Sequence, residues 1–258
     1  LNIRNATALG SAAGGTTVAS GAALSIQNNI VVADEALTLS GTGVSNGGAL
    51  RNISGSNTYS GAITLGAATR INADAGTLTL NSATAITDAQ NLTFGGAGAI
   101  VVSTALQTGA GTLTKDGTGT TTLTGANTYT GLTNVSVGSL NIQNATALGT
   151  ADAGTTVASG ATLQLQGGIT VADEALTLSG TGVSAGGALR NISGNNTYSG
   201  AITLGAATRI NSDAGTLTLD SATAITDAQN LTFGGAGATI VSTALQTGAG
   251  TLTKDGAG

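Results

Sequence analysis

Residues 113–140 read LTKDGTGTTTLTGANTYTGLTNVSVGSL and combine the two features that decide the fold. Aliphatic and small polar residues alternate over very short runs, as in Val135-Ser136-Val137, and a period of two places them on opposite sides of a strand. Clusters such as KDGTG separate the runs, and glycine and asparagine tolerate the positive φ of sharp turns. The stretch therefore predicts strands of about three to five residues joined by tight turns.

The same apolar-polar-apolar pattern recurs along the whole chain. It is found at Leu24-Ser25-Ile26, Leu37-Thr38-Leu39, Ile63-Thr64-Leu65, Leu78-Thr79-Leu80, Leu92-Thr93-Phe94 and Leu140-Asn141-Ile142. Apolar positions 13 to 15 residues apart are Leu24, Leu37, Leu50, Ile63, Leu78, Leu92 and Leu106. No apolar face at helical spacing is long enough to predict a helix. The chain is therefore expected to be all-β.

A long repeat organises these short strands. LNIRNATALG at Leu1 returns as LNIQNATALG at Leu140, and the offset of 139 then holds to the last residue with 17 differences among 119 paired positions. Each unit also looks doubled internally, with a half-unit of about 70 residues. We therefore expect residues 1–139 to be one unit and residues 140–258 a second, incomplete unit of one continuous solenoid, itself a fragment of a longer array.

Composition limits the class of protein. The chain has 258 residues with 42 glycines, no proline, cysteine, histidine, methionine or tryptophan, and a net charge of −5 from only 7% charged residues. So few charges argue against disorder, because an open chain of this hydropathy would aggregate. Five arginines and two lysines, scattered singly, form no basic patch for nucleic acid. No stretch is long and apolar enough to predict membrane insertion, and the opening residues LNIRNATALG do not have the basic-then-apolar pattern of a signal peptide.

Many short strands could form a sandwich, a propeller or a coil of parallel strands. Very short strands, small aliphatic interior residues and nested periods favour the coil, because stacking repeats like on like. The predicted fold is a right-handed, single-stranded parallel β-helix, whose turns follow one another at about 4.8 Å. Five to seven turns per unit would then advance the rod by roughly 24 to 34 Å.

The stretch from Leu113 to Leu140 resembles the autotransporter-associated β-strand repeat, found in passenger domains of large secreted bacterial surface proteins. The matching positions are Leu113, Lys115, Gly117, Gly119, Leu123, Gly125, Asn127, Thr128, Tyr129, Gly131, Thr133, Val135, Gly138 and Leu140. Leu132 departs from the family, which usually has another glycine there. The resemblance implies a right-handed parallel β-helix, export across an outer membrane and display as an extracellular rod at the bacterial cell surface.

An Asn-Thr-Tyr motif holds all three tyrosines of the chain. Its repeat residues are Asn57, Tyr59 and Gly61; Gly125, Asn127, Tyr129 and Gly131; and Asn196, Tyr198 and Gly200. In one interpretation the motif is a turn: the asparagine bonds nearby backbone, and the tyrosine packs its ring over a glycine-rich turn with its hydroxyl in solvent. In the other, the tyrosine is an exposed aromatic that binds sugar rings. We favour the turn, because the residue is stereotyped within each repeat.

Catalytic chemistry finds few candidate residues. The only adjacent acids are Asp34-Glu35 and the copy Asp173-Glu174, and neighbours along a strand point to opposite faces. The isolated acids are interpreted as solvent-exposed residues in turns. They are Asp74, Asp88 and Asp116. Without histidine or cysteine, nucleophile-base pairs and soft-metal sites lose their usual residues. We expect no enzyme activity, no cofactor and no metal.

Ice binding is a further hypothesis, because Thr-x-Thr on a flat solenoid face can match a lattice. The pairs are Thr77-Thr79, Thr112-Thr114, Thr120-Thr122, Thr216-Thr218 and Thr251-Thr253. Their separations of 35 and 8 residues within the first unit do not repeat once per turn. Outward threonines chosen for their β-propensity are the simpler explanation.

The sequence therefore predicts a structural, non-catalytic segment of an extracellular rod, stalk or fibre. Expected partners are further copies of the repeat in the same chain or end-to-end association, because an open final turn exposes unpaired backbone groups. An adhesin that binds glycans or neighbouring cells through a side face is the main alternative. Ice binding and a polysaccharide-active enzyme are weaker ones.

Overall fold

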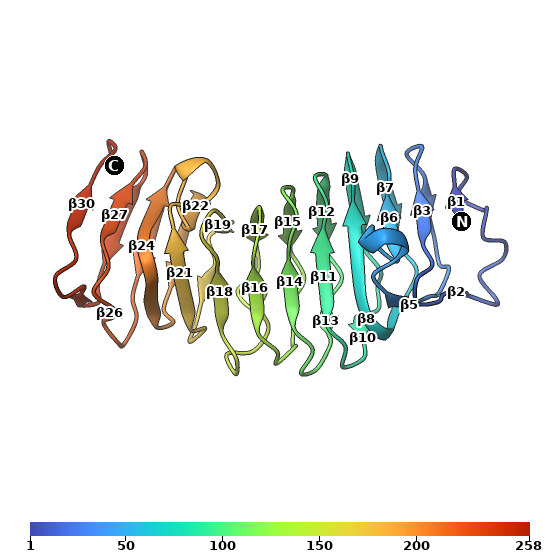
Figure 1. The fold of residues 1–258 in the computed structure, drawn as a ribbon, viewed down its shortest axis with the longest axis horizontal. Helices are drawn as coiled ribbons and strands as arrows, with labels where there is room; N and C mark the ends of the chain where they lie inside the picture. The colour runs from blue at the N-terminus through green and yellow to red at the C-terminus, as the bar shows by residue number, and fades with distance from the viewer.

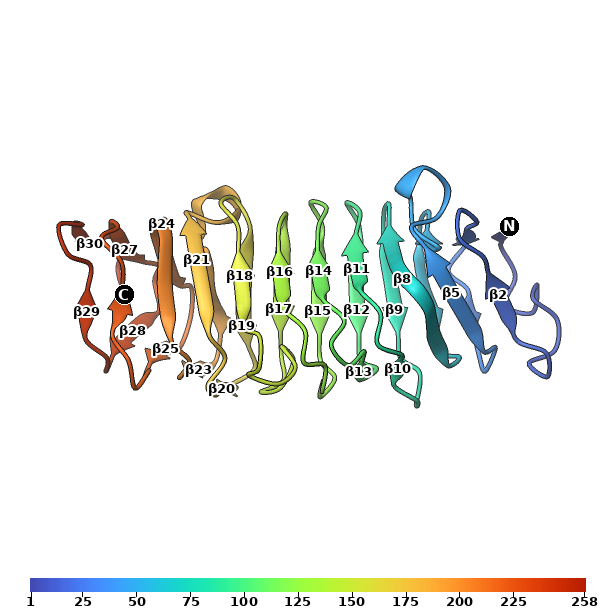
Figure 2. The ribbon, with the colours of Figure 1, turned by 60° about the horizontal axis from the view of Figure 1, so that its bottom comes forward.

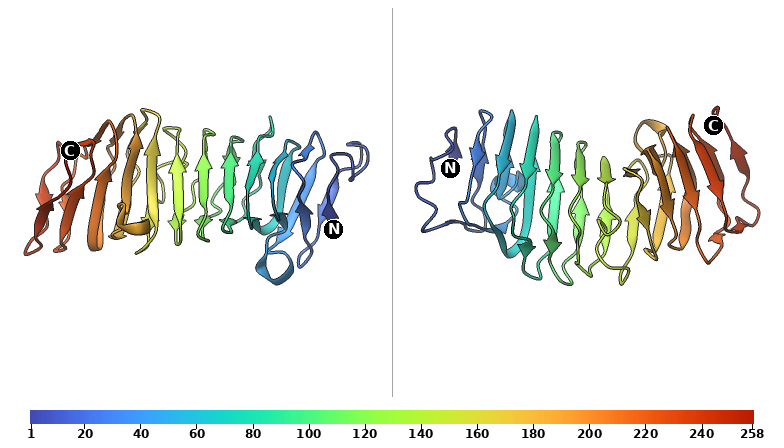
Figure 3. Two further views of the ribbon diagram at one scale, coloured as in Figure 1. Left: turned by 90° about the horizontal axis from the view of Figure 1, so that it is seen from above. Right: turned by 180° about the vertical axis from the view of Figure 1, so that it is seen from behind.

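The computed structural model describes residues 1–258 and is a β-solenoid of about 12 turns. Figure 1 shows the turns stacked into a rod with the two termini at opposite ends, and the views of Figures 2 and 3 agree. Every strand pairing is parallel. The all-β parallel solenoid predicted from the sequence is therefore confirmed. No helix is long and apolar enough to cross a membrane.

Each turn has three faces, which we name A, B and C in chain order. Face A holds β2 (Thr16–Val18), β5 (Leu37–Gly41), the start of β8 (Ile63–Ala73), β10 (Ile86–Thr87), β13 (Leu106–Gln107), β20 (Thr170–Val171), β23 (Asn195–Tyr198), β25 (Thr216–Leu219) and β28 (Ala238–Val241). Face B holds β1 (Asn2–Ile3), β3 (Leu24–Ile26), β6 (Leu50–Asn52), the end of β8, β11 (Leu92–Gly95), β14 (Leu113–Lys115), β16 (Thr133–Val135), β18 (Thr155–Val157), β21 (Leu176–Gly180), the start of β24 (Ile202–Ser212), β26 (Ile225–Thr226) and β29 (Leu245–Gln246). Face C holds β4 (Val31–Val32), β7 (Ser56–Tyr59), β9 (Thr77–Leu80), β12 (Ala99–Val102), β15 (Thr120–Leu123), β17 (Ser139–Ile142), β19 (Thr162–Gln166), β22 (Leu189–Ser193), the end of β24, β27 (Leu231–Gly234) and β30 (Leu252–Lys254).

Alternation along each strand builds the core. In β3 and β9 the aliphatic residues are buried and the intervening serine or threonine faces outward. Parallel pairing in register then stacks equivalent side chains into columns, such as Leu24, Leu50, Ile71 and Phe94. One cluster of 50 buried apolar residues runs through the molecule. Val137 departs from the prediction, because the chain turns after β16 and leaves this side chain 43% exposed.

A full turn takes 20 to 26 residues. The register leads from Leu24 through Leu50, Ile71, Phe94, Lys115 and Val135 to Val157. The 13-to-15-residue spacing seen in the sequence therefore does not correspond to a turn. From Leu24 on face B to Leu37 on face A, for example, it spans two faces.

The 139-residue unit does not contain a whole number of turns. Six turns separate Leu24 from Val157 on face B, but Leu163, the counterpart of Leu24, lies on face C. The second unit is thus rotated by one face relative to the first. About 6⅓ turns at 4.8 Å give an advance of roughly 30 Å per unit, within the range expected from the sequence.

One loop projects from the rod in each unit. It contains a short 3₁₀ segment, η1 (Val44–Asn46) after β5 and η2 (Val183–Ala185) after β21. In Figure 1 the first loop faces the viewer, whereas the second rises from the upper edge. This change of direction follows from the rotation by one face.

Candidate functional site

The asparagines of the Asn-Thr-Tyr motif point into the solenoid and are almost fully buried. Asn57 Oδ1 accepts from the Ile30 backbone N–H at 2.8 Å. Its Nδ2 donates to Ser54 O at 2.8 Å and to Asn52 Oδ1 at 2.6 Å. This amide satisfies backbone groups of its own turn and of the preceding turn, and it therefore ties the two together.

In the other two copies of the motif, the asparagine side-chain amide also bonds to a neighbouring turn. Asn196 Oδ1 accepts from Ile169 N at 2.7 Å, and Nδ2 donates to Ser193 O at 2.9 Å and also to Asn191 Oδ1. Asn127 accepts from Leu106 N at 2.8 Å and donates to Ala147 O at 2.6 Å. The structure thus places all three asparagines as links between successive turns.

All three tyrosines are fully buried, and for Tyr59 in β7 and Tyr198 in β23 the alternation along the strand directs the side chain into the core. Tyr59 Oη donates to Glu35 O at 2.7 Å, and Tyr198 Oη donates to Glu174 O at 2.8 Å. Tyr129 Oη shares a hydrogen bond of 2.7 Å with Thr133 Oγ1. The expectation of a hydroxyl in solvent is therefore wrong, and a surface tyrosine that grips sugar rings is also contradicted. Burial raises the pKa of all three phenols well above its usual value.

The glycine two positions after each tyrosine allows a close approach of turns. A Cβ at Gly61 or Gly200 would overlap the carbonyl oxygen of Glu35 or Glu174, and one at Gly131 would overlap that of Gly111. A Cβ at Gly125 would crowd the Thr104 carbonyl in the same way. The stereotyped Tyr-x-Gly spacing therefore follows from packing between turns.

The adjacent acids point in opposite directions and do not converge. Asp34 and Asp173 are exposed at positive φ, whereas Glu35 and Glu174 are buried. Thr155 Oγ1 donates to Glu174 Oε1 at 2.7 Å, and the first unit repeats this contact. Burial raises the pKa of Glu174, and the Thr155 hydrogen bond opposes that shift.

Four arginine–aspartate pairs connect turns on the outside, two of them between successive turns and two across an intervening turn. Arg51 Nε donates to Asp74 at 2.7 Å, and Arg70 Nη1 donates to Asp116 at 2.7 Å. The second unit repeats them as Arg190–Asp213 and Arg209–Asp255. Asp74 and Asp116 are thus paired acids, and their interpretation as solvent-exposed residues in turns is corrected. Arginine and aspartate are separated by 23 residues in the first pair and by 46 in the second, which correspond to one and two turns. These separations were the sequence signal for the pairs.

Lys115 occupies an aliphatic column between Phe94 and Val135 and is 2% exposed. Its Nζ donates to the carbonyls of Asp116, Gly117 and Val137 at 3.2, 2.7 and 3.0 Å. Burial lowers the pKa of this amine to about 8, with Asp116 opposing the shift and Arg70 adding to it. The ammonium therefore joins its own turn to the next turn from within.

The first Thr-x-Thr pair does not continue as a column of threonines onto the next turn. Thr77 and Thr79 pair with Ala99 and Val101 on the next turn. An outward single file of threonines on face A consists of Thr17, Thr38, Thr64 and Thr87 and is followed by Gln107.

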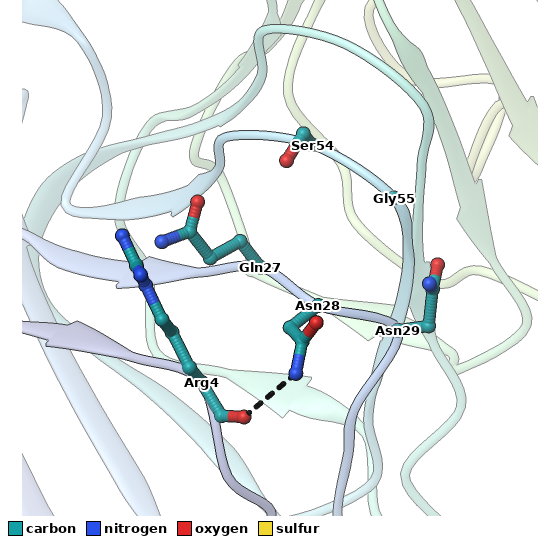
Figure 4. A pocket seen from close by; sticks show the side chains of 6 residues that line it. All are labelled: Arg4, Gln27, Asn28, Asn29, Ser54 and Gly55. Atoms are coloured by element: carbon teal, nitrogen blue, oxygen red, sulfur yellow. Dashed lines mark hydrogen bonds between the residues drawn. The ribbon is translucent and has the colours of Figure 1, made fainter.

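A polar cavity of about 340 Å³ opens at the corner between faces B and C of the first three turns (Figure 4). Its lining residues are Arg4, Gln27, Asn28, Asn29, Ser54 and Gly55, none of them hydrophobic. No group of three or more acidic residues that could hold a metal ion occurs in residues 1–258. The chain thus combines an inner polar framework with a polar hollow on its outer surface.

Comparison with known proteins gives one family match. Residues 113–142 match the model described as the passenger-associated-transport-repeat, which coincides with the stretch singled out in the sequence. Neither the curated proteins nor the solved structures contain a significant match to the chain.

Proposed function

We propose that this chain, a β-solenoid of the autotransporter passenger type, serves as a segment of a stiff extracellular rod. It carries a passenger-associated-transport-repeat at residues 113–142. The family supports an exported surface protein with a structural role. The rod, its display outside the cell and its lack of catalysis are the proposed refinements.

The observation that carries the proposal is the unbroken stacking across the junction of the two units. On face B, Lys115 of the first unit pairs with Val135, which pairs in turn with Val157 of the second. On face C, Leu123 pairs with Ile142 and then with Leu165. Because backbone pairing and buried columns cross the junction together, the junction has no hinge, and bending would break ladder hydrogen bonds.

In this proposal, the number of repeat units in the chain sets the length of the rod. Each unit adds about 6⅓ turns, so a tandem array would lengthen by roughly 30 Å per unit without a new interface. We propose further copies of the repeat as the main partners, reached through the same stacking.

Small-angle scattering of chains with two, three and four units tests this role. The maximum dimension should rise by roughly 30 Å with each unit, and the cross-section should stay constant. A maximum dimension that levels off, or a cross-section that grows with length, would contradict a stiff rod. Insertion of a flexible Gly-Ser linker at residues 138–139 provides the control, because it should restore bending at one junction.

A further inference from the structure

We propose that the polar corner cavity of the first unit binds a sugar residue that bears a carboxylate, of the uronic-acid class. This goes beyond the rod function, and either can hold without the other. The cavity is formed by three successive turns: Arg4 follows β1, Gln27 to Asn29 follow β3, and Ser54 and Gly55 lie between β6 and β7.

The size and the lining of the cavity define the ligand class. Its volume of about 340 Å³ is at the small end of ligand pockets, which suits a single ring. The absence of hydrophobic lining residues gives no site for an aliphatic or aromatic side chain. Hydroxyl-rich ligands match such a lining, because each hydroxyl both donates and accepts.

Arg4 supplies the charge preference. The other four arginines are each paired with an aspartate, and Arg4 has no carboxylate partner. The Gln27 amide is best turned by 180° from its orientation in Figure 4, because its oxygen then accepts from Arg4 Nε and Nη2 and from Asn2 Nδ2. Gln27 thereby holds the guanidinium at the cavity, and Nη1 remains free for a carboxylate.

Neutral amides and a hydroxyl complete the lining. Asn28 Nδ2 donates to Arg4 O at 3.3 Å, which leaves its Oδ1 unpaired. Asn29 Oδ1 accepts from Ser56 N at 2.7 Å, which leaves its Nδ2 unpaired. Ser54 Oγ has no partner within the chain. These free groups can bond ring hydroxyls, and a single cation matches one carboxylate better than a doubly charged phosphate.

The second unit provides an internal comparison. Gln143 stands where the first unit has Arg4, and Gly167-Gly168 replace Asn28-Asn29. Asn28 and Asn29 have φ of 82° and 56°, and the two glycines have φ of 97° and 75°. The backbone corner is therefore retained at both places, and only the first unit carries the side chains that would recognise a ligand.

Titration with D-galacturonate and D-glucuronate, followed by NMR or calorimetry, tests the site. The control ligands are D-galactose, acetate and inorganic phosphate. We expect saturable binding of a uronate, and Arg4→Gln should weaken it by roughly ten- to a hundredfold, because a charge-assisted bond is lost. This variant should fold normally, because the second unit carries glutamine at the equivalent position.

A transplant in the second unit gives the complementary result. The triple variant Gln143→Arg, Gly167→Asn, Gly168→Asn should raise the stoichiometry from one to two. Absence of saturable uronate binding, or binding indifferent to Arg4→Gln, would overturn the site. Equal affinity for acetate or phosphate would overturn the sugar assignment. None of these outcomes alters the length increments by which the rod is tested.

Discussion

The two units carry almost the same sequence on different faces of one solenoid. β8 and β24 have identical burial patterns, although β8 runs from face A to face B and β24 from face B to face C. The tyrosine–glutamate contact is likewise kept, on face C as Tyr59–Glu35 and on face A as Tyr198–Glu174. A strand is therefore specified by its neighbours one turn away and not by a fixed side of the rod.

This comparison explains how a unit with a fractional number of turns can be repeated. The face-B column of the first unit is continued at Val157 by a strand whose counterpart, β2, lies on face A of the first unit. Any face can accept any strand, provided that its inward residues match the column in size. At the corner cavity the units differ in outward side chains that the stack does not constrain.

The largest effect should come from the buried asparagines. Asn57→Ala and Asn196→Ala each leave a backbone N–H and a neighbouring amide without partners, so each should lower the free energy of unfolding by about 3 kcal/mol. Urea denaturation with hydrogen exchange resolved by turn would measure both. As a control, Asn46→Ala should change stability by less than about 0.5 kcal/mol, because the second unit has Ala185 there. A much larger loss of stability for one of the two variants would show that the asparagines do not have equivalent roles in the two units.

The arginine pairs should distinguish the units. Arg70 and Asp116 have side chains 16% and 35% exposed, so Arg70→Ala should cost about 1 to 2 kcal/mol. The counterpart Arg209→Ala should cost less, because Asp255 is 51% exposed and solvent screens the pair. Thermal unfolding at low and at high salt would compare them. A larger loss at Arg209 would contradict the burial argument.

The stability contribution of Glu174 should depend on pH. Because burial raises its pKa in the folded state, the folded state holds the proton more tightly than the unfolded state. The contribution of Glu174 to stability is then fully present below its unfolded pKa and is lost as pH rises through its folded pKa. Glu174→Gln should therefore stabilise the chain at pH 7 and lose this advantage below pH 4.5. Denaturation curves across pH would measure this, with Asp173→Asn at an exposed position as the control. If the Glu174 carboxylate were stabilising, Glu174→Gln would instead lower stability at pH 7.

The smallest effect should come from Thr121, an inward threonine between Ile100 and Leu140. Its buried Oγ1 has no hydrogen-bond partner. Thr121→Val keeps the shape and removes the unpaired hydroxyl, so it should stabilise the chain by about 1 kcal/mol. Thr122→Val on the outward side should have no comparable effect. A destabilised Thr121→Val variant would mean that the hydroxyl has a partner after all.

The strands could be predicted from the sequence because alternation is a local property. Leu37-Thr38-Leu39 needs no knowledge of its neighbours to show which side is buried. The family stretch was also recognisable locally, from Leu113 onward.

Features that join turns could not be predicted as readily. The solvent-exposed hydroxyl assigned to Tyr59 was wrong because its acceptor, the Glu35 carbonyl, lies one turn earlier. The Arg51–Asp74 pair becomes visible only when the turn length of about 23 residues is known. Lys115 was not predicted to be buried, because a charged residue in an aliphatic column is satisfied by carbonyls that only the folded turn brings together.

The buried columns continue through both units, and the second unit is rotated by one face relative to the first. The chain has no cysteine, so a pair introduced across the junction reports the register directly. Asn134 on β16 pairs with Thr156 on β18, and Asn134→Cys with Thr156→Cys should form a disulfide under mild oxidation. Thr128 lies on face A, one turn after Gln107, and a second unit stacked without rotation would place Thr156 next to it. Thr128→Cys with Thr156→Cys, on different faces, should therefore remain reduced. Cross-linking of the second pair and not the first would show that the units stack without rotation, and would contradict the account.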